Sequence, residues 1–208
     1  MHPKGFEITC RKCGQPLDTH ILNCPSEDSL SLDYIAGFFD GEGTASIKAS
    51  QTSKSWCGIG FTPRLSFAQK TPEILEKIAY ELGIAGKGFK LPHRLTGSKG
   101  AYGECYRLET NKFDDVLRIA KMLQPRCQLK KRQLEIVIEA TELLLKTGYP
   151  QRRGYKSAIP KETIEKLLTL TEEIRQLNSK NPEHRNYTDL EVVRNALELS
   201  PNKKTKEV

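Results

Sequence analysis

The sequence lacks an unbroken apolar stretch long enough to cross a bilayer, and its first ten residues, MHPKGFEITC, show no basic segment followed by an apolar one. It does contain enough hydrophobic residues to form a core. With 37% hydrophobic and 28% charged residues, its composition is that of a folded chain and not of a disordered coil. We therefore expect an intracellular protein with no membrane partner, in the cytoplasm of a prokaryote or in an organelle.

Cysteine is scarce, with six residues in 208, and a disulfide framework is not expected in a chain of this length without a secretory context. Half of the cysteines fall in the first 24 residues, where the spacing C-x2-C-G-x5-H-x3-C could close a tetrahedral zinc site. The alternative is a set of free thiols. The candidate Zn²⁺ ligands, in a Cys-rich N-terminal extension over 1–30, are Cys10, Cys13, His20 and Cys24.

Positive charge exceeds negative charge, with 33 Lys and Arg against 26 Asp and Glu. The excess is not evenly spread, since residues 1–42 are acidic, residues 157–208 are balanced, and the stretches 43–107 and 118–156 are basic. This distribution favours one face in the middle of the chain that meets a polyanion, although a solvated basic surface would give the same count.

Hydrophobic periodicity divides the chain into helices and hairpins. Leu32, Ile35 and Phe39 recur at helical spacing, and this helix should end at the sequence Gly41-Glu42-Gly43. From there the period becomes two, which predicts a hairpin with one polar, basic face. The remaining predicted elements are a helix opened by Pro72, a second hairpin over 86–110, helices at about 113–123, 128–146, 161–178 and 188–199, and a frayed tail over 201–208. Together they predict an α+β fold in which helices cover the apolar face of one antiparallel sheet.

The stretch IAGFFDGEG, residues 35–43, has three glycines in a helical segment, and each glycine costs roughly 1 kcal/mol relative to alanine. Gly37 and Gly41 are four residues apart, so they share one helical face and let a second backbone approach closely. Glu42 then places a carboxylate at the helix C-terminus, where the helix dipole disfavours negative charge and a cation would relieve it. Two such helices side by side would hold two carboxylates together, which suits hard divalent metal ions.

This run resembles the LAGLIDADG motif of homing endonucleases. The segments LSFAQKTPE, LQPRCQLKKRQ and EEIRQLNSK are also similar to the single-motif enzymes encoded by group I introns of rRNA genes, and the resemblance covers residues 31–200. It implies the αββαββα fold of that family, an antiparallel β-saddle with helices on one face, here with extra C-terminal helices. It further implies a meganuclease, a hydrolase that cuts both strands of a long double-stranded DNA target in a metal-dependent reaction and leaves short 3′ overhangs.

The chain contains one such motif, whereas the family's metal site needs a carboxylate from each of two motif helices. The resemblance therefore implies a symmetric homodimer and a pseudo-palindromic DNA target. A nine-residue strand spans about 30 Å, or roughly nine base-pair steps, so the dimer should read on the order of 18 bp. The residues expected at the dimer interface are Ala36, Gly37, Asp40 and Gly41.

The resemblance also assigns roles at the catalytic site. Glu42 matches the acidic metal ligand and Gly41 the backbone carbonyl of the same site, with Mg²⁺ or another divalent cation bound there. Gln69 matches the residue that orients the attacking water, and Lys130 the one that stabilises charge on the phosphate. A further basic residue of the family has no clear counterpart, and the candidates to replace it are Lys70 and Arg126.

Recognition of DNA is expected from the outward positions of the strands, because a two-stranded ribbon fits the major groove. The residues expected to read bases are Lys48, Ser50, Thr62, Arg64, Ser66, Lys90, His93 and Arg107. The residues expected to contact phosphates are Lys54, Lys99, Arg152, Arg153 and Lys156.

Two other functions remain open at this stage. One is a non-cleaving LAGLIDADG protein, either an RNA maturase or a DNA-binding regulator, although degenerate motifs usually lose the acid and this one keeps Glu42. The other is a zinc-dependent nucleic-acid-binding module whose functional part is the N-terminal extension.

Overall fold

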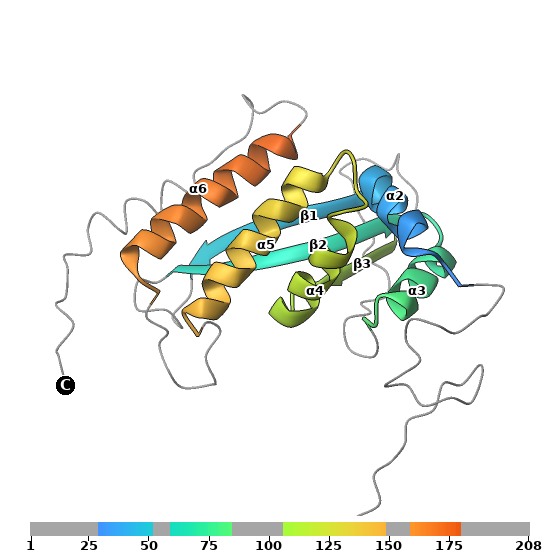
Figure 1. Cartoon of the computed structure of the whole chain (residues 1–208), viewed down its shortest axis with the longest axis horizontal. Coiled ribbons are helices and arrows are strands. Elements are labelled where there is room, and N and C mark those ends of the chain that lie inside the picture. The colour runs from blue at the N-terminus through green and yellow to red at the C-terminus, as the bar shows by residue number, and fades with distance from the viewer. Residues whose placement is uncertain (1–28, 52–58, 85–105, 149–158, 180–208) are drawn as a thin grey trace, which may run out of the picture.

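The computed structural model describes residues 29–51, 59–84, 106–148 and 159–179 (Figure 1). Their elements are helix α2 (Leu32–Glu42), strands β1 (Gly43–Gln51) and β2 (Ile59–Gln69), helix α3 (Pro72–Glu81), strand β3 (Tyr106–Thr110), and helices α4 (Phe113–Leu123), α5 (Lys131–Lys146) and α6 (Lys161–Leu177). In this part of the chain no helix is long and apolar enough to span a membrane.

Several expectations lie outside the described residues. These are the N-terminal extension with Cys10, Cys13, His20 and Cys24, the first strand of the second hairpin, the helix at 188–199, the tail, and the DNA contacts Lys54, Lys90, His93, Lys99, Arg152, Arg153 and Lys156.

The three strands form one antiparallel sheet in the order β1-β2-β3. Gly43 at the start of β1 lies opposite Phe67 of β2, which in turn lies opposite Leu108 of β3. The predicted α+β class, with an antiparallel sheet and helices on one face, is confirmed.

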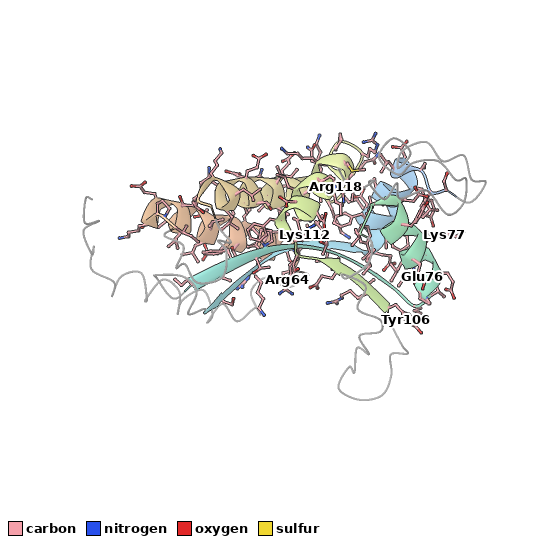
Figure 2. The ribbon with its side chains drawn as sticks, turned by 90° about the horizontal axis from the view of Figure 1, so that it is seen from below. Arg64, Glu76, Lys77, Tyr106, Lys112 and Arg118 are labelled. Carbon is pink, nitrogen blue, oxygen red and sulfur yellow. The ribbon has the colours of Figure 1, made fainter. Side chains whose placement is uncertain are left out.

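The period of two in the strands separates the two faces of this sheet. The side chains that alternate toward the helices are buried, among them Ile47, Phe61 and Leu65, with 3%, 0% and 0% of their surface exposed. The alternate positions of β2, such as Thr62 and Arg64, stay partly exposed. Figure 2 shows the sheet bent into an arch, with the helices on one side and Arg64 on the other. Apolar burial on the helical side is the main stabilising contribution, and the polar side chains of the other face stay partly exposed.

The helices among the described residues match their predicted bounds closely, with one difference. The pattern predicts a helix from about 128 to 146, but α5 begins at Lys131 and is preceded by a turn. Two backbone N–H groups of this turn, those of Gln128 and Lys130, donate to the carboxylate of Asp40 on α2. This side chain therefore satisfies two backbone N–H groups at the start of α5, where N–H groups have no partner within a helix.

Candidate functional site

The end of α2 presents a carboxylate to solvent. Ser31 caps the start of the helix, where its Oγ accepts from the N–H of Tyr34 at 3.1 Å, and the helix then runs to Glu42, which is exposed. At the C-cap, a Cβ on Gly43 would overlap the ring and the carbonyl oxygen of Phe39, so the chain can turn directly into β1 because residue 43 has no side chain. Glu42 therefore stands at the junction of helix and sheet, at the negative end of the helix dipole.

Beside this junction lies a cavity of about 700 Å³. It combines the end of α2 with outward side chains of the sheet, the start of α5 and the last turn of α6. The side chain of Asn178 after α6 donates to the carbonyl oxygen of Ala45 at 2.7 Å and so holds this helix end against β1. The polar residues that line the cavity are Glu42, Thr44, Ser46, Lys48, Arg64, Lys130, Gln133, Arg175 and Asn178.

Lys130 places a positive charge at the end of α2. Its Nζ donates to the carbonyl oxygens of Phe39 at 3.0 Å, Gly41 at 3.4 Å and Gly43 at 2.6 Å, which lie together where α2 ends and β1 begins. Burial lowers the pKa of Lys130 below its usual value, against the opposing effect of the Asp40 and Glu42 carboxylates. The ammonium group is therefore fixed next to Glu42 by backbone atoms.

Asp40 fixes the segment that carries this lysine. Its Oδ2 accepts from the N–H of Gln128 at 2.7 Å and its Oδ1 from the N–H of Lys130 at 2.9 Å. Burial acts to raise the pKa of Asp40, but these backbone hydrogen bonds outweigh it and hold the pKa below its usual value. The carboxylate thus bonds to its own chain, and its expected place at a dimer interface stays a prediction.

Cys127 joins the same contact between α2 and the turn. Its thiol is 3% exposed and donates to the carbonyl oxygen of Ala36 at 3.5 Å. Burial, with the nearby charge of Asp40, raises the pKa of the Cys127 thiol to about 12. The group is a packed, free thiol with little nucleophilic character.

The opposite side of α2 is open. Gly37 and Gly41 are exposed, and a Cβ added to either would meet no atom within 4 Å. Tyr34 on the same helix keeps 49% of its surface exposed. Ala36, in contrast, is 0% exposed because it faces the core of its own chain, so it lies on the other side of the helix from the two glycines.

The structure places the other predicted residues as follows. Lys48, Ser50, Thr62, Arg64, Ser66 and Arg107 all occupy the alternate, partly or fully exposed positions of the strands. Gln69 ends β2, where its Oε1 accepts from the N–H of Lys70 at 2.7 Å, and it is not among the residues that line the cavity. Arg126 forms an ion pair with Asp33 at 3.2 Å, so it serves the contact of its turn with the start of α2.

The described residues supply one carboxylate for a metal. No group of three or more His, Cys, Asp or Glu side chains that could hold an ion occurs among them. Glu42 and the carbonyl of Gly41 are nevertheless hard oxygen donors on adjacent residues, which fits Mg²⁺ or a similar ion that keeps several of its waters.

Sequence reasoning missed two features of this region. Neither the cavity-lining pair of Arg175 and Asn178 nor the acidic residue Glu109 on β3 was expected at the site. Glu109 follows Arg107 by two residues and therefore shares its face of the strand, so the period of two alone could have revealed it. The position of α6 beside β1 depends on tertiary packing and leaves no such pattern.

Comparisons with known proteins identify the fold. No family profile and no curated protein matches the chain. Among solved structures, the archaeal intron-encoded homing endonuclease I-Vdi141I complexed with DNA superimposes with a TM-score of 0.62 and 20% identity, over 80% of this chain and 94% of that one. I-CvuI in complex with the I-CreI target gives 0.59 and 18%, over 80% and 92%. The LAGLIDADG meganuclease I-CpaMI bound to uncleaved DNA gives 0.54 and 13%, over 72% of this chain but 47% of that one. The fold is that of the LAGLIDADG homing endonucleases.

Within this LAGLIDADG fold, the motif stretch expected from the sequence is α2 with its junction to β1. The chain spans nearly the whole of I-Vdi141I and I-CvuI, but about half of I-CpaMI.

Proposed function

We propose that the protein is a site-specific endonuclease that cuts both strands of a long, pseudo-palindromic double-stranded DNA target and acts as a homodimer. The observation that carries this proposal is the exposed carboxylate of Glu42 at the junction between an open, glycine-lined helix face and the polar face of the sheet. The LAGLIDADG fold, shared with homing endonucleases solved on DNA, supports it. We also propose that the protein is of the single-motif type encoded by group I introns.

The homodimer follows from the number of acids. One chain offers Glu42 alone at the cavity, since Asp40 is bonded to its own backbone. Packing Gly37 and Gly41 against the same residues of a second copy would bring two Glu42 side chains together, an isologous contact. The dimer should then read on the order of 18 bp, because each nine-residue β1 covers about 30 Å.

In the reaction, Glu42 and the carbonyl of Gly41 would hold a divalent cation, with Mg²⁺ as the natural choice. The ion, when bound, supplies activation of a water and neutralisation of the phosphate charge. Lys130 holds its ammonium group beside Glu42 through three backbone carbonyls, so it can stabilise negative charge that develops on the phosphate. Gln69, positioned at the end of β2, is proposed to orient the water, and cleavage is proposed to leave short 3′ overhangs.

The test uses the full chain on a library of double-stranded DNA fragments with Mg²⁺, followed by sequencing of the cut ends. We expect cuts at one pseudo-palindromic sequence. The variant Glu42→Gln should bind that target with unchanged affinity and cut it about 10³-fold more slowly. The reason is that an ion at this position stabilises the charge of the transition state by several kcal/mol. The matched control is Glu81→Gln, which removes the same charge at the end of α3, away from the cavity.

Three results would contradict the proposal. The first is cutting by Glu42→Gln at the wild-type rate. The second is binding to folded RNA with no cutting of any DNA, which would favour a maturase. The third is loss of all nucleic-acid binding in Cys10→Ser alone, which would favour the N-terminal module.

A further inference from the structure

The polar face of the sheet carries one acidic residue among basic and small polar ones. In the described strands, the outward positions of β1, β2 and β3 are Thr44, Ser46, Lys48, Ser50, Gly60, Thr62, Arg64, Ser66, Ala68, Arg107 and Glu109. Of these, Glu109 alone is acidic. If this face meets DNA, a carboxylate there is unfavourable toward every phosphate that it approaches. The presence of Glu109 on this face therefore needs an explanation other than direct attraction to DNA.

Glu109 bonds to the neighbouring arginine. It lies opposite Ser66, and Arg64 is the next outward residue along β2, so the two side chains are diagonal neighbours. Nη1 of Arg64 donates to Oε1 of Glu109 at 3.2 Å, and their side chains are 29% and 34% exposed. Nε of Arg64 is buried with no hydrogen-bond partner among the described residues. One edge of the guanidinium is thus held by the carboxylate, and Figure 2 shows this arginine on the side of the sheet away from the helices.

This ion pair contributes little to the stability of the fold. Pairs that remain about a third exposed are screened by solvent and contribute little to folding. What the pair does fix is the direction of the guanidinium, which otherwise has several rotamers and reaches phosphates as easily as bases. A fixed arginine on a ribbon in the major groove can donate to the O6 and N7 atoms of a guanine, the contact that carries most base discrimination.

We propose that Glu109 is a specificity-determining residue: it holds Arg64 on a base edge and withholds it from phosphates. This inference rests on the proposed function, since it needs the polar face to bind duplex DNA. Glu109 would then contribute to specificity by lowering the affinity of the protein for non-target DNA.

The test compares Glu109→Gln with wild type in metal-free buffer, on the selected target and on a panel with each base pair replaced symmetrically. We expect wild type to discriminate by about tenfold or more at one position of each half-site, and Glu109→Gln to discriminate by less than about twofold there, with other positions unchanged. The variant should also bind non-target DNA more tightly. The DNA-binding constant of the variant should fall more steeply with salt concentration, by the equivalent of about one phosphate contact for each protomer. The reason is that the released arginine would contact the DNA phosphates.

Two controls assign the effect. Glu139→Gln removes a carboxylate of similar exposure that pairs with Lys166 on the helical side, at 2.6 Å, and should leave binding unchanged. In a cycle with Arg64→Gln, the loss caused by Glu109→Gln should disappear, because both residues act through one contact. Additive losses would mean that Glu109 contacts a base itself, and they would overturn the inference.

The outcomes separate the two proposals. Unchanged discrimination and salt dependence in Glu109→Gln, with normal target binding by wild type, overturns the role of Glu109 alone. Failure of wild type to bind any duplex DNA overturns the proposed function and this inference together.

Discussion

The inner and outer sides of the end of α2 use the same kind of side chain for opposite purposes. On the inner side, Asp40 accepts hydrogen bonds from two backbone N–H groups of the turn before α5. On the outer side, Glu42 is exposed, and no hydrogen bond from another described residue reaches its carboxylate. An acid bound by its own chain supports the fold, whereas an acid left at the unfavourable end of a helix dipole is available to a ligand.

The same division separates the small residues of the helix. Ala36 is buried and its carbonyl accepts from Cys127, while Gly37 and Gly41 face outward with no atom near the position of a Cβ. Since glycine weakens a helix by roughly 1 kcal/mol, the outer side gives up stability in the single chain. This cost is offset if a second copy packs there.

The largest effect in this comparison, after that of Glu42→Gln, is expected from Gly37→Leu. The free energy of unfolding of the isolated chain should stay the same or rise by up to about 1 kcal/mol. Leucine is a better helix former than glycine, and no atom lies within 4 Å of a Cβ at this position. The dimer should dissociate and DNA cleavage should fall with it. Sedimentation velocity at micromolar concentration measures the mass, and urea unfolding measures the stability.

Glu165→Leu is the control for an added apolar side chain, because residue 165 is an exposed position of α6. It should stay dimeric. A Gly37→Leu protein that sediments and cuts like wild type would remove the outer side of α2 from the interface.

The next effect is expected from Asp40→Asn on the inner side. An amide oxygen can replace one of the two acceptors but not the charge, so the free energy of unfolding should fall by about 1–2 kcal/mol at pH 7. Because the folded state lowers the pKa of Asp40, its contribution is present above pH 4 and is lost as the pH falls through the folded pKa. The difference from wild type should therefore shrink below pH 4.

Urea unfolding at several pH values from 3 to 7 measures this difference. Asp33→Asn, which changes an 85% exposed side chain in the first turn of the same helix, should cost a few tenths of a kcal/mol. A loss of equal size in both variants, or one independent of pH, would mean that the carboxylate of Asp40 is not the group that fixes the turn.

The sequence predicted most of what depends on local pattern. The ends of α2, the hairpin of β1 and β2, and α4 and α6 follow from apolar spacing, glycine and proline, and so does the polar face on which Arg64 and Arg107 lie. The start of α5 could not be predicted this way, because the turn before it is fixed by Asp40, some ninety residues earlier.

The site shows the same limit. The resemblance assigned Glu42 and Lys130, but not the three carbonyls that hold the lysine or the contact between Glu109 and Arg64. These depend on which segments pack together, and single-sequence patterns do not contain that information. Ala36 and Asp40 were grouped with the two glycines because they lie beside them on the motif helix. Ala36 is buried in its own chain and the glycines are exposed, while the place of these residues at a dimer interface stays a prediction.

The last comparison concerns Cys127, the inner neighbour of Asp40, whose reactivity bears on the packing of α2 and not on DNA cleavage. A pKa of about 12 in place of 9.0 means a roughly 10³-fold smaller thiolate fraction, so at pH 8.5 iodoacetamide should alkylate this residue about 10³-fold more slowly in the native protein than in urea. Peptide mapping by mass spectrometry resolves it from the other cysteines. Because the charge of Asp40 helps to raise this pKa, Asp40→Asn should make the native thiol more reactive, whereas Glu42→Gln, on the outer side, should not. Equal rates in native and unfolded protein would place Cys127 at the surface, and the inner side of α2 would then lose the packing that distinguishes it from the outer side.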